Sequence, residues 1–346
     1  MRQSMPLEDW PQADRTLWLA LRQRGGPFDD RGAQAHLRDS SARMYVSAYG
    51  RWLEWLRRED PAALNIHPAL RATLPRMRTW LEAMQLLQPT SRAIFFTNVL
   101  RVLDAAAPDA DWSAHRRLRN GLAQATGRGD PGRKAGRILS SQILLEAGLR
   151  HAGPEAEAAL TPLQRAARQR DGAMIALLAM VPMRHRAFSG LRIGHSLLIG
   201  PATLTVALPQ ELTKSGRPWE ADIPEPASKL LRRYVEATRP FLMDRRGHRH
   251  DLLWVGNEGA PMGYSYIGRR IPDIASRLTG VRIPPHFFRD AAATTLARAS
   301  PAAARVIAPV LAHSDRGTAE RHYIQAGSIE AARDYADVLR RLRRHR

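Results

Sequence analysis

The sequence contains no cysteine, and this absence excludes disulfide bonds, thiol catalysis and cysteine-ligated zinc. It also lacks any apolar run close to the eighteen or more residues that a membrane-spanning helix needs. Its opening stretch, MRQSMPLEDWPQADR, has none of the apolar core of a signal peptide. We therefore expect a protein of the reducing cytoplasm, with no membrane as a partner.

Lysine is scarce, although the chain is strongly basic. Lys and Arg together number 53, yet only Lys134, Lys214 and Lys229 are lysines. A Lys ammonium can release a proton to a reacting group, whereas an Arg guanidinium keeps its charge near neutral pH. A catalytic site that needs a cationic proton donor would have to keep a lysine, which makes these three residues candidates.

Basic residues outnumber acidic residues by a wide margin. Asp and Glu number 33, so the formal net charge is +20. Such a charge favours polyanionic partners, and no amphipathic membrane anchor supports anionic lipid, so we expect a nucleic acid. The chain has 346 residues, of which 44% are hydrophobic, and this is enough for two domains with packed cores.

The N-terminal half is predicted to be a small helical domain behind a flexible lead-in. Residues 1–32 contain clusters of Gly, Pro and charge, and we interpret them as the lead-in. From Ser40, apolar residues recur at spacings of three and four, as on one face of an amphipathic helix. Similar stripes predict further helices over 77–87, from 89 onward and over 112–125. Residues 33–126 would form this domain, with Arg92 and Arg101 as candidate phosphate contacts.

The C-terminal half mixes helices with strands. Residues 127–137, GRGDPGRKAGR, are interpreted as an exposed basic linker, and a catalytic domain follows over 138–327. Alternating β-branched residues predict a strand over 202–209, and 212–224 predicts a strand, a turn and a return strand. Helical patterns cover 140–152, 160–182, 226–243, 264–278, 286–299, 301–312 and 328–345. The predicted fold class is mainly α with a small antiparallel β-sheet (α+β).

Five elements of the second domain, in their order, resemble the catalytic domain of the tyrosine recombinase (phage integrase) family. They are Arg184 at the end of an apolar helix, Lys214 in Thr-Lys-Ser-Gly, His286 and Arg289 in His-Phe-Phe-Arg, His313 in Leu-Ala-His-Ser, and Thr318 followed by Tyr323. A His-x-x-Arg box alone is weak, since the chain has it twice, but the ordered set is specific. The helical N-terminal half is similar to the core-binding domain of the family, so the resemblance spans residues 40–330.

The nucleophile and the phosphate clamp follow from the chemistry of the side chains. Displacing an alkoxide from a phosphodiester needs a nucleophile, a clamp for the non-bridging oxygens and an acid for the leaving group. Tyr323 can form a covalent intermediate, although its proton must be removed with the help of nearby positive charge. Arg184 and Arg289 offer planar forks for the phosphate oxygens.

Three further residues complete the candidate site. Lys214 can protonate the leaving 5′-oxygen, a step that Arg could not perform. His286 and His313 can hold the phosphate or move a proton near neutral pH. These cations would supply the positive charge that Mg²⁺ supplies in many phosphoryl-transfer sites, and no acidic cluster stands out. We therefore expect no metal and no cofactor.

Two residues compete for the role of first arginine. The apolar helix ends immediately before Arg184, which favours this residue. However, Ser189-Gly190-Leu191-Arg192-Ile193 also resembles the first-arginine signature of the family, so Arg192 is the alternative. The sequence departs from the family pattern at Ala187, where an acidic residue is common, and at Ala312, where glycine is common.

The resemblance also implies a reaction and an assembly. Tyr323 would attack the scissile phosphate of double-stranded DNA, form a 3′-phosphotyrosyl link and free a 5′-hydroxyl. A 5′-hydroxyl of a partner strand would then reverse the attack without ATP. Four protomers, a homo-tetramer or a set that includes sister recombinases, would act on paired DNA sites. Each protomer would close around DNA as a C-shaped clamp. Residues 328–346 would pack as a helix on a neighbouring protomer, or else on their own chain.

The leading interpretation is an integrase of a mobile element or plasmid, acting in the cytoplasm on the nucleoid. A dimer-resolution recombinase of the same chemistry and a catalytically silent, integrase-derived DNA-binding protein are the alternatives. A type IB topoisomerase would use the same residue types. The helical half that is similar to a core-binding domain disfavours it.

Overall fold

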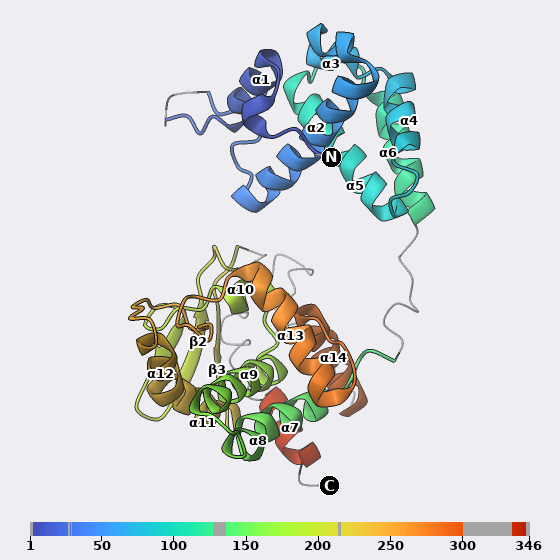
Figure 1. Cartoon of the computed structure of the whole chain (residues 1–346). Coiled ribbons are helices and arrows are strands. Elements are labelled where there is room, and N and C mark those ends of the chain that lie inside the picture. Colours follow the sequence, from blue (N-terminus) through green and yellow to red (C-terminus); the bar gives the residue numbers. More distant parts are fainter. Residues whose placement is uncertain are drawn as a thin grey trace. The chain divides into compact units, whose positions relative to one another are not determined.

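The computed structural model describes residues 3–26, 28, 30–126, 136–213, 216–299 and 334–343. The chain divides into two compact units, Met1–Asp130 and Pro131–Arg346 (Figure 1). Each unit has a hydrophobic core of its own. The combination of many helices with one three-stranded antiparallel sheet confirms the predicted α+β class.

The described part of the first unit contains six α-helices and two short 3₁₀ turns. The turns are Leu7–Asp9 and Pro61–Asn65, and the helices are α1 (Gln12–Arg22), α2 (Asp39–Glu59), α3 (Pro68–Arg71), α4 (Leu74–Ala83), α5 (Pro89–Ala106) and α6 (Ser113–Thr126). The predicted start of a helix at Pro89 is confirmed, since α5 begins at this residue. Proline suits the first position of a helix, where a backbone N–H would have no partner within the helix.

The core of the first unit forms between α2 and α5. Tyr49, Trp52 and Leu56 recur at spacings of three and four on α2, and all three are fully buried. They belong to the same core as Phe96 and Val99 of α5. The amphipathic pattern that begins at Ser40 therefore correctly predicts which face of α2 is buried in the core.

The stretch expected to be a flexible lead-in, residues 1–32, contains helix α1, which is anchored in this core. Trp18 is 4% exposed, and Asp14 forms an ion pair with Arg71 in which both side chains are 0% exposed. The phenol of Tyr49 donates a hydrogen bond to Asp14 at 2.7 Å. This part of the chain is therefore not a flexible lead-in. Its apolar and acidic side chains have buried partners that are far away in the sequence.

The second unit combines a small sheet with many helices. Its elements are α7 (Ser141–Ala152), α8 (Pro154–Glu157), α9 (Pro162–Met180), α10 (His185–Ser189), β1 (Leu197–Ile199), β2 (Leu204–Leu208), β3 (Trp219–Asp222), α11 (Ala227–Arg233), a π-helical turn (Tyr234–Thr238), α12 (Arg239–Asp244), α13 (Tyr264–Thr279) and α14 (Pro285–Ala299). Residues 334–343 are also helical. Within the described residues of both units, no helix is long and apolar enough to cross a membrane.

Helix α9 is the central element of this unit. Every residue of α9 from Gln169 to Met180 is buried, and α7 packs along it. The two helices approach closely at Gly148 and Gly172, where a Cβ on Gly172 would lie 2.4 Å from the carbonyl oxygen of Gly148. Only glycine fits such a crossing. The buried helix holds the chain rigidly up to the turn that carries Arg184.

The sheet has the order β1-β2-β3, with antiparallel neighbours. Leu208 of β2 pairs with Trp219 of β3, so the strand predicted over 202–209 is confirmed. The prediction of a strand at Leu212 is wrong, because Leu212 donates a backbone hydrogen bond to the carbonyl of Pro209 within a turn. Strand β1 is too short to show an alternating pattern.

Residues 334–343 pack on their own chain in this single protomer. The phenol of Tyr335 is fully buried and donates a hydrogen bond to the carbonyl of Ala179 in α9 at 2.6 Å. The amide of Gln142 in α7 donates to the carbonyl of Leu342 at 3.0 Å. The single chain thus shows the alternative of packing in cis, with the C-terminal helix beside α7 and α9 (Figure 1). Exchange of this helix between protomers stays a prediction.

Candidate active site

Arg184 lies where the chain leaves the central helix. Helix α9 ends at Met180, and Arg184 is the residue that precedes α10, with an extended backbone at φ −68° and ψ 146°. Its side chain is half-buried, and burial lowers the pKa of its guanidinium. No described residue accepts a hydrogen bond from Arg184 or forms an ion pair with it. This cation is therefore partly withdrawn from water and has no anionic partner among the described residues.

Arg289 reaches the same place from α14. It lies in the first half of that helix and donates a hydrogen bond from its guanidinium to the carbonyl of Pro182 at 2.9 Å. Pro182 stands two residues before Arg184, so this bond sets the distance between the two elements that carry the arginines. The buried rings of Phe287 and Phe288 fix α14 on the core.

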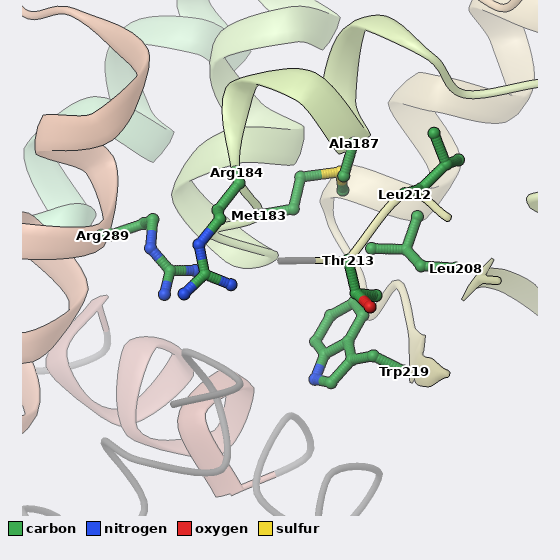
Figure 2. A pocket seen from close by; sticks show the side chains of 8 residues that line it. All are labelled: Met183, Arg184, Ala187, Leu208, Leu212, Thr213, Trp219 and Arg289. Carbon is green, nitrogen blue, oxygen red and sulfur yellow. The ribbon is translucent and has the colours of Figure 1, made fainter. Parts of the chain in front are cut away.

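The two guanidiniums line one pocket of about 320 Å³, which includes space open to solvent. Figure 2 shows them together on one side of the pocket, with mainly apolar side chains on the other. The full lining is Met183, Arg184, Ala187, Leu208, Leu212, Thr213, Trp219 and Arg289. Two planar forks beside an apolar wall form a site for an anion with several oxygens, such as a phosphate.

The positive charges of Arg184 and Arg289 repel each other in this pocket. Burial, together with the neighbouring Arg184, lowers the pKa of Arg289 from its ordinary value to about 10. Two cations that share a half-buried site disfavour each other's charged form, while an anion between them would favour both. The two neighbouring guanidiniums therefore favour the binding of an anion in this pocket.

His286 lies on the same helix, three residues before Arg289. Residues at this spacing share one face of a helix. His286 is exposed, and its ring meets the ring of Phe287 edge-on, with the two ring centroids 4.7 Å apart. Its charge helps burial to lower the pKa of His185, which places the two imidazoles near each other. His185 directly follows Arg184. An exposed imidazole therefore lies near His185, on the helix that also carries Arg289.

Arg192, the alternative first arginine, has a different role in the structure. It is exposed and donates two hydrogen bonds to the carboxylate of Asp251, at 2.7 and 2.8 Å. It does not line the pocket of Arg184 and Arg289. Its guanidinium is occupied by a surface ion pair, so the geometry favours Arg184 over Arg192.

The position of the missing family acid, Ala187, lies inside the pocket. Its side chain is 2% exposed and contributes to the apolar wall. An acidic side chain here would bring a counter-charge close to the arginines, and alanine brings none. The departure from the family pattern therefore leaves the pocket more positive.

The remaining predicted site residues lie outside the described residues. These are Lys214, His313 and Tyr323, and the same holds for Ala312, Thr318 and Lys134. The residue before Lys214 is described: Thr213 is buried and lines the pocket. Within the described part of the chain, no group of three or more His, Cys, Asp or Glu side chains could hold a metal ion.

Trp219 is a pocket residue that the sequence analysis did not identify. It pairs with Leu208 across the sheet, and both side chains are buried on the face that contributes to the pocket. The sequence does contain the alternating pattern of a strand, in which every second residue lies on the same face of the sheet. This pattern does not tell which face of the sheet lies beside the arginines, so Trp219 could not be assigned to the pocket from the sequence.

The comparisons with known proteins agree with this architecture. A solved structure titled XerH site-specific recombinase bound to palindromic difH substrate, a post-cleavage complex, is similar to 95% of the chain, with a TM-score of 0.52. The two sequences are 15% identical, and 98% of that chain is covered. The described units of this protein therefore have the fold of a site-specific recombinase.

Two further structures are similar at lower TM-scores. A pre-cleavage complex of XerH with difH has a TM-score of 0.49 and 13% identity, with 96% of each chain covered. XerA recombinase has a TM-score of 0.36 and 16% identity, with 87% of this chain and 92% of that chain covered. No curated protein sequence matches the chain.

A sequence profile of the phage integrase family matches residues 154–328, which is just over half of the chain. The match includes all six predicted site residues. The chain belongs to the phage integrase family and is a tyrosine recombinase. The resemblance carried by the ordered motifs is thereby confirmed.

Proposed function

We propose that this protein cleaves and rejoins double-stranded DNA at specific sites, through a covalent bond between Tyr323 and a 3′-phosphate. One observation carries the proposal: Arg184 and Arg289, from elements far apart in the sequence, line one pocket, and no described residue forms an ion pair with Arg184. A scissile phosphate would supply the missing negative charge. Its two non-bridging oxygens suit two planar forks.

The roles of the site residues follow from their chemistry. Arg184 and Arg289 would stabilise the charge that develops on the phosphate, and the apolar wall would exclude water and strengthen this effect. His286 would hold an oxygen or move a proton. His313 would act beside it, and Lys214 would protonate the leaving 5′-oxygen. Attack by Tyr323 exchanges one phosphate ester for another, so the strand can later be rejoined without ATP.

The wider role is an integrase of a mobile element or plasmid, which acts in the cytoplasm on DNA of the nucleoid as a tetramer on paired sites. The net charge of +20 supports a DNA partner. The XerH structure with the TM-score of 0.52, which is a post-cleavage complex with a palindromic difH substrate, supports the same class of substrate. Inverted repeats or element ends in the DNA around the gene would identify the substrate.

A suicide substrate tests the proposed chemistry. A nicked duplex made from the DNA that flanks the gene should trap an SDS-resistant covalent adduct with the wild-type protein. Tyr323→Phe should abolish the adduct. Tyr266→Phe, which changes an exposed tyrosine on α13, should leave it unchanged. A protein that retards DNA in a gel but never forms the covalent band would be a silent DNA-binding protein, and the proposal would be wrong.

A further inference from the structure

Trp219 has a buried indole N–H that donates to no described residue. The side chain is 6% exposed, and its Nε1 atom is buried without a hydrogen-bond partner among the described residues. An indole nitrogen can only donate, and burying a donor without an acceptor costs free energy. Buried donors that lack a partner are rare in native structures, and one that lines a binding pocket calls for an explanation.

The position of this donor is informative. Trp219 is the first residue of β3 and lines the same pocket as Arg184 and Arg289, with the indole across the pocket from the two guanidiniums (Figure 2). Its pairing with Leu208 holds the backbone in the sheet. The indole is thus a fixed group on the wall that faces the predicted position of the phosphate.

A second buried indole N–H without a described partner, that of Trp52, provides a comparison for Trp219. Trp52 also has a buried Nε1 without a described partner, but it lies in the core of the first unit. Its ring stacks on Trp55 and meets Trp80 edge-on, both with ring centroids 5.3 Å apart. Trp52 is enclosed by aromatic rings, whereas Trp219 borders a pocket that attracts anions.

We propose that Trp219 is a third fixed donor for the phosphate, donating its indole N–H to an oxygen of the anion that Arg184 and Arg289 clamp. This inference rests on the proposed function and adds a contact to it. The nitrogen is closed off in the free chain, so the pocket must adjust as the anion enters. The long, unbranched side chain of Met183 also lines the pocket and can make this adjustment by changing rotamer.

A neutral donor suits this wall of the pocket. A third cation would add to the repulsion that already lowers the pKa of Arg289. The indole N–H brings a hydrogen bond without charge and does not titrate. Trp219 would therefore orient the phosphate between the arginines at any pH at which the guanidiniums are charged.

The indole resonances of the full-length protein provide a direct test. The chain has eight tryptophans, so a ¹⁵N–¹H spectrum of the indoles is simple, and Trp219→Phe assigns the signal of interest. Titration with inorganic phosphate should shift the Trp219 signal downfield and leave the Trp52 signal in place. Sodium chloride at equal ionic strength should have no such effect, and Arg184→Ala should abolish the phosphate-dependent shift.

The affinity for phosphate provides a second measurement. Trp219→Phe keeps an aromatic ring but loses the N–H, and it should weaken phosphate binding on the order of tenfold. Trp52→Phe removes a buried indole elsewhere and should leave the affinity within about twofold, since it touches no group of the pocket. Equal binding by wild type and Trp219→Phe would overturn the inference.

The outcomes separate this inference from the proposed function. A Trp219 signal that stays fixed while phosphate saturates the pocket would reject the third donor alone. A pocket that takes up no phosphate would also reject it. Failure of the wild-type protein to form a covalent adduct with DNA would reject the proposed function, whatever the indole signal does.

Discussion

The guanidinium of Arg289 donates a hydrogen bond to the carbonyl of Pro182, two residues before Arg184. This contact joins α14 to the turn after α9 and brings together two cations that are far apart in the sequence. The partners are a rigid backbone carbonyl and a planar fork, so the bond fixes direction as well as distance. The anion pocket depends on this arrangement.

Removal of either arginine should slow formation of the covalent adduct much more than it weakens DNA binding. Arg184→Ala and Arg289→Ala should each reduce the rate on the order of 10²–10³-fold, by analogy with the loss of an oxyanion donor. The rate is measured with the nicked duplex at saturating protein. Arg192→Ala is the matched control, because its ion pair with Asp251 is exposed and outside the pocket. A large loss with Arg192→Ala and a small loss with Arg184→Ala would reverse the assignment.

Cleavage should not depend on a divalent metal. The charge on the phosphate would be balanced by guanidiniums, so adduct formation should proceed at an unchanged rate in EDTA. The measurement compares the protein with and without prior dialysis against EDTA. Activity that is lost in EDTA and restored by Mg²⁺ would contradict the proposed arrangement of charges.

Binding of a phosphate diester should weaken as the pH rises through about 10. The pKa of Arg289 is lowered to about 10 by burial and by Arg184, so this guanidinium is protonated below that pH and loses its proton above it. Dimethyl phosphate is a suitable probe, because it keeps a single negative charge over the whole range. Calorimetry at pH 8, 9, 10 and 10.5 should show constant affinity at first and then a decrease. Binding should also take up protons near pH 10, since a bound anion raises the pKa again.

Arg289→Gln is the control for this pH dependence. The variant should bind dimethyl phosphate more weakly at pH 8, and its affinity should lose the decrease near pH 10. If the decrease persists in the variant, another group is responsible for it.

The buried pair of Asp14 and Arg71 should be essential for the stability of the first unit. Arg71→Met leaves the carboxylate of Asp14 buried without its cation, and this should reduce the free energy of unfolding by about 3–5 kcal/mol. Urea denaturation followed by tryptophan fluorescence would measure the change. Replacing Glu258, which forms exposed ion pairs with Arg245 and Arg246, should change the free energy of unfolding far less, because solvent screens surface ion pairs. A flexible N-terminal segment would instead make Arg71→Met no more harmful than this surface change.

Much of the helical framework could be predicted from local patterns. Helix α2 begins at Asp39 and was expected from Ser40, and α13 and α14 were expected within one or two residues of their bounds. The period of apolar residues is a local property that records which face of a helix will be buried. The burial of Trp18 and Asp14 could not be predicted in this way, because their partners come from distant stretches of the chain.

The sequence by itself determined the family of this protein and the residue types of its candidate active site. The order of its Arg, Lys, His-x-x-Arg, His and Tyr elements identifies the family, since side-chain type and spacing along the chain are fully contained in the sequence. Only the tertiary structure decided which arginine accompanies Arg289 and that Trp219 borders the same pocket. Arg184 and Arg192 carry the same guanidinium and lie close together in the chain. What separates them is that one enters a half-buried pocket and the other meets the carboxylate of Asp251, and such surroundings exist only after folding.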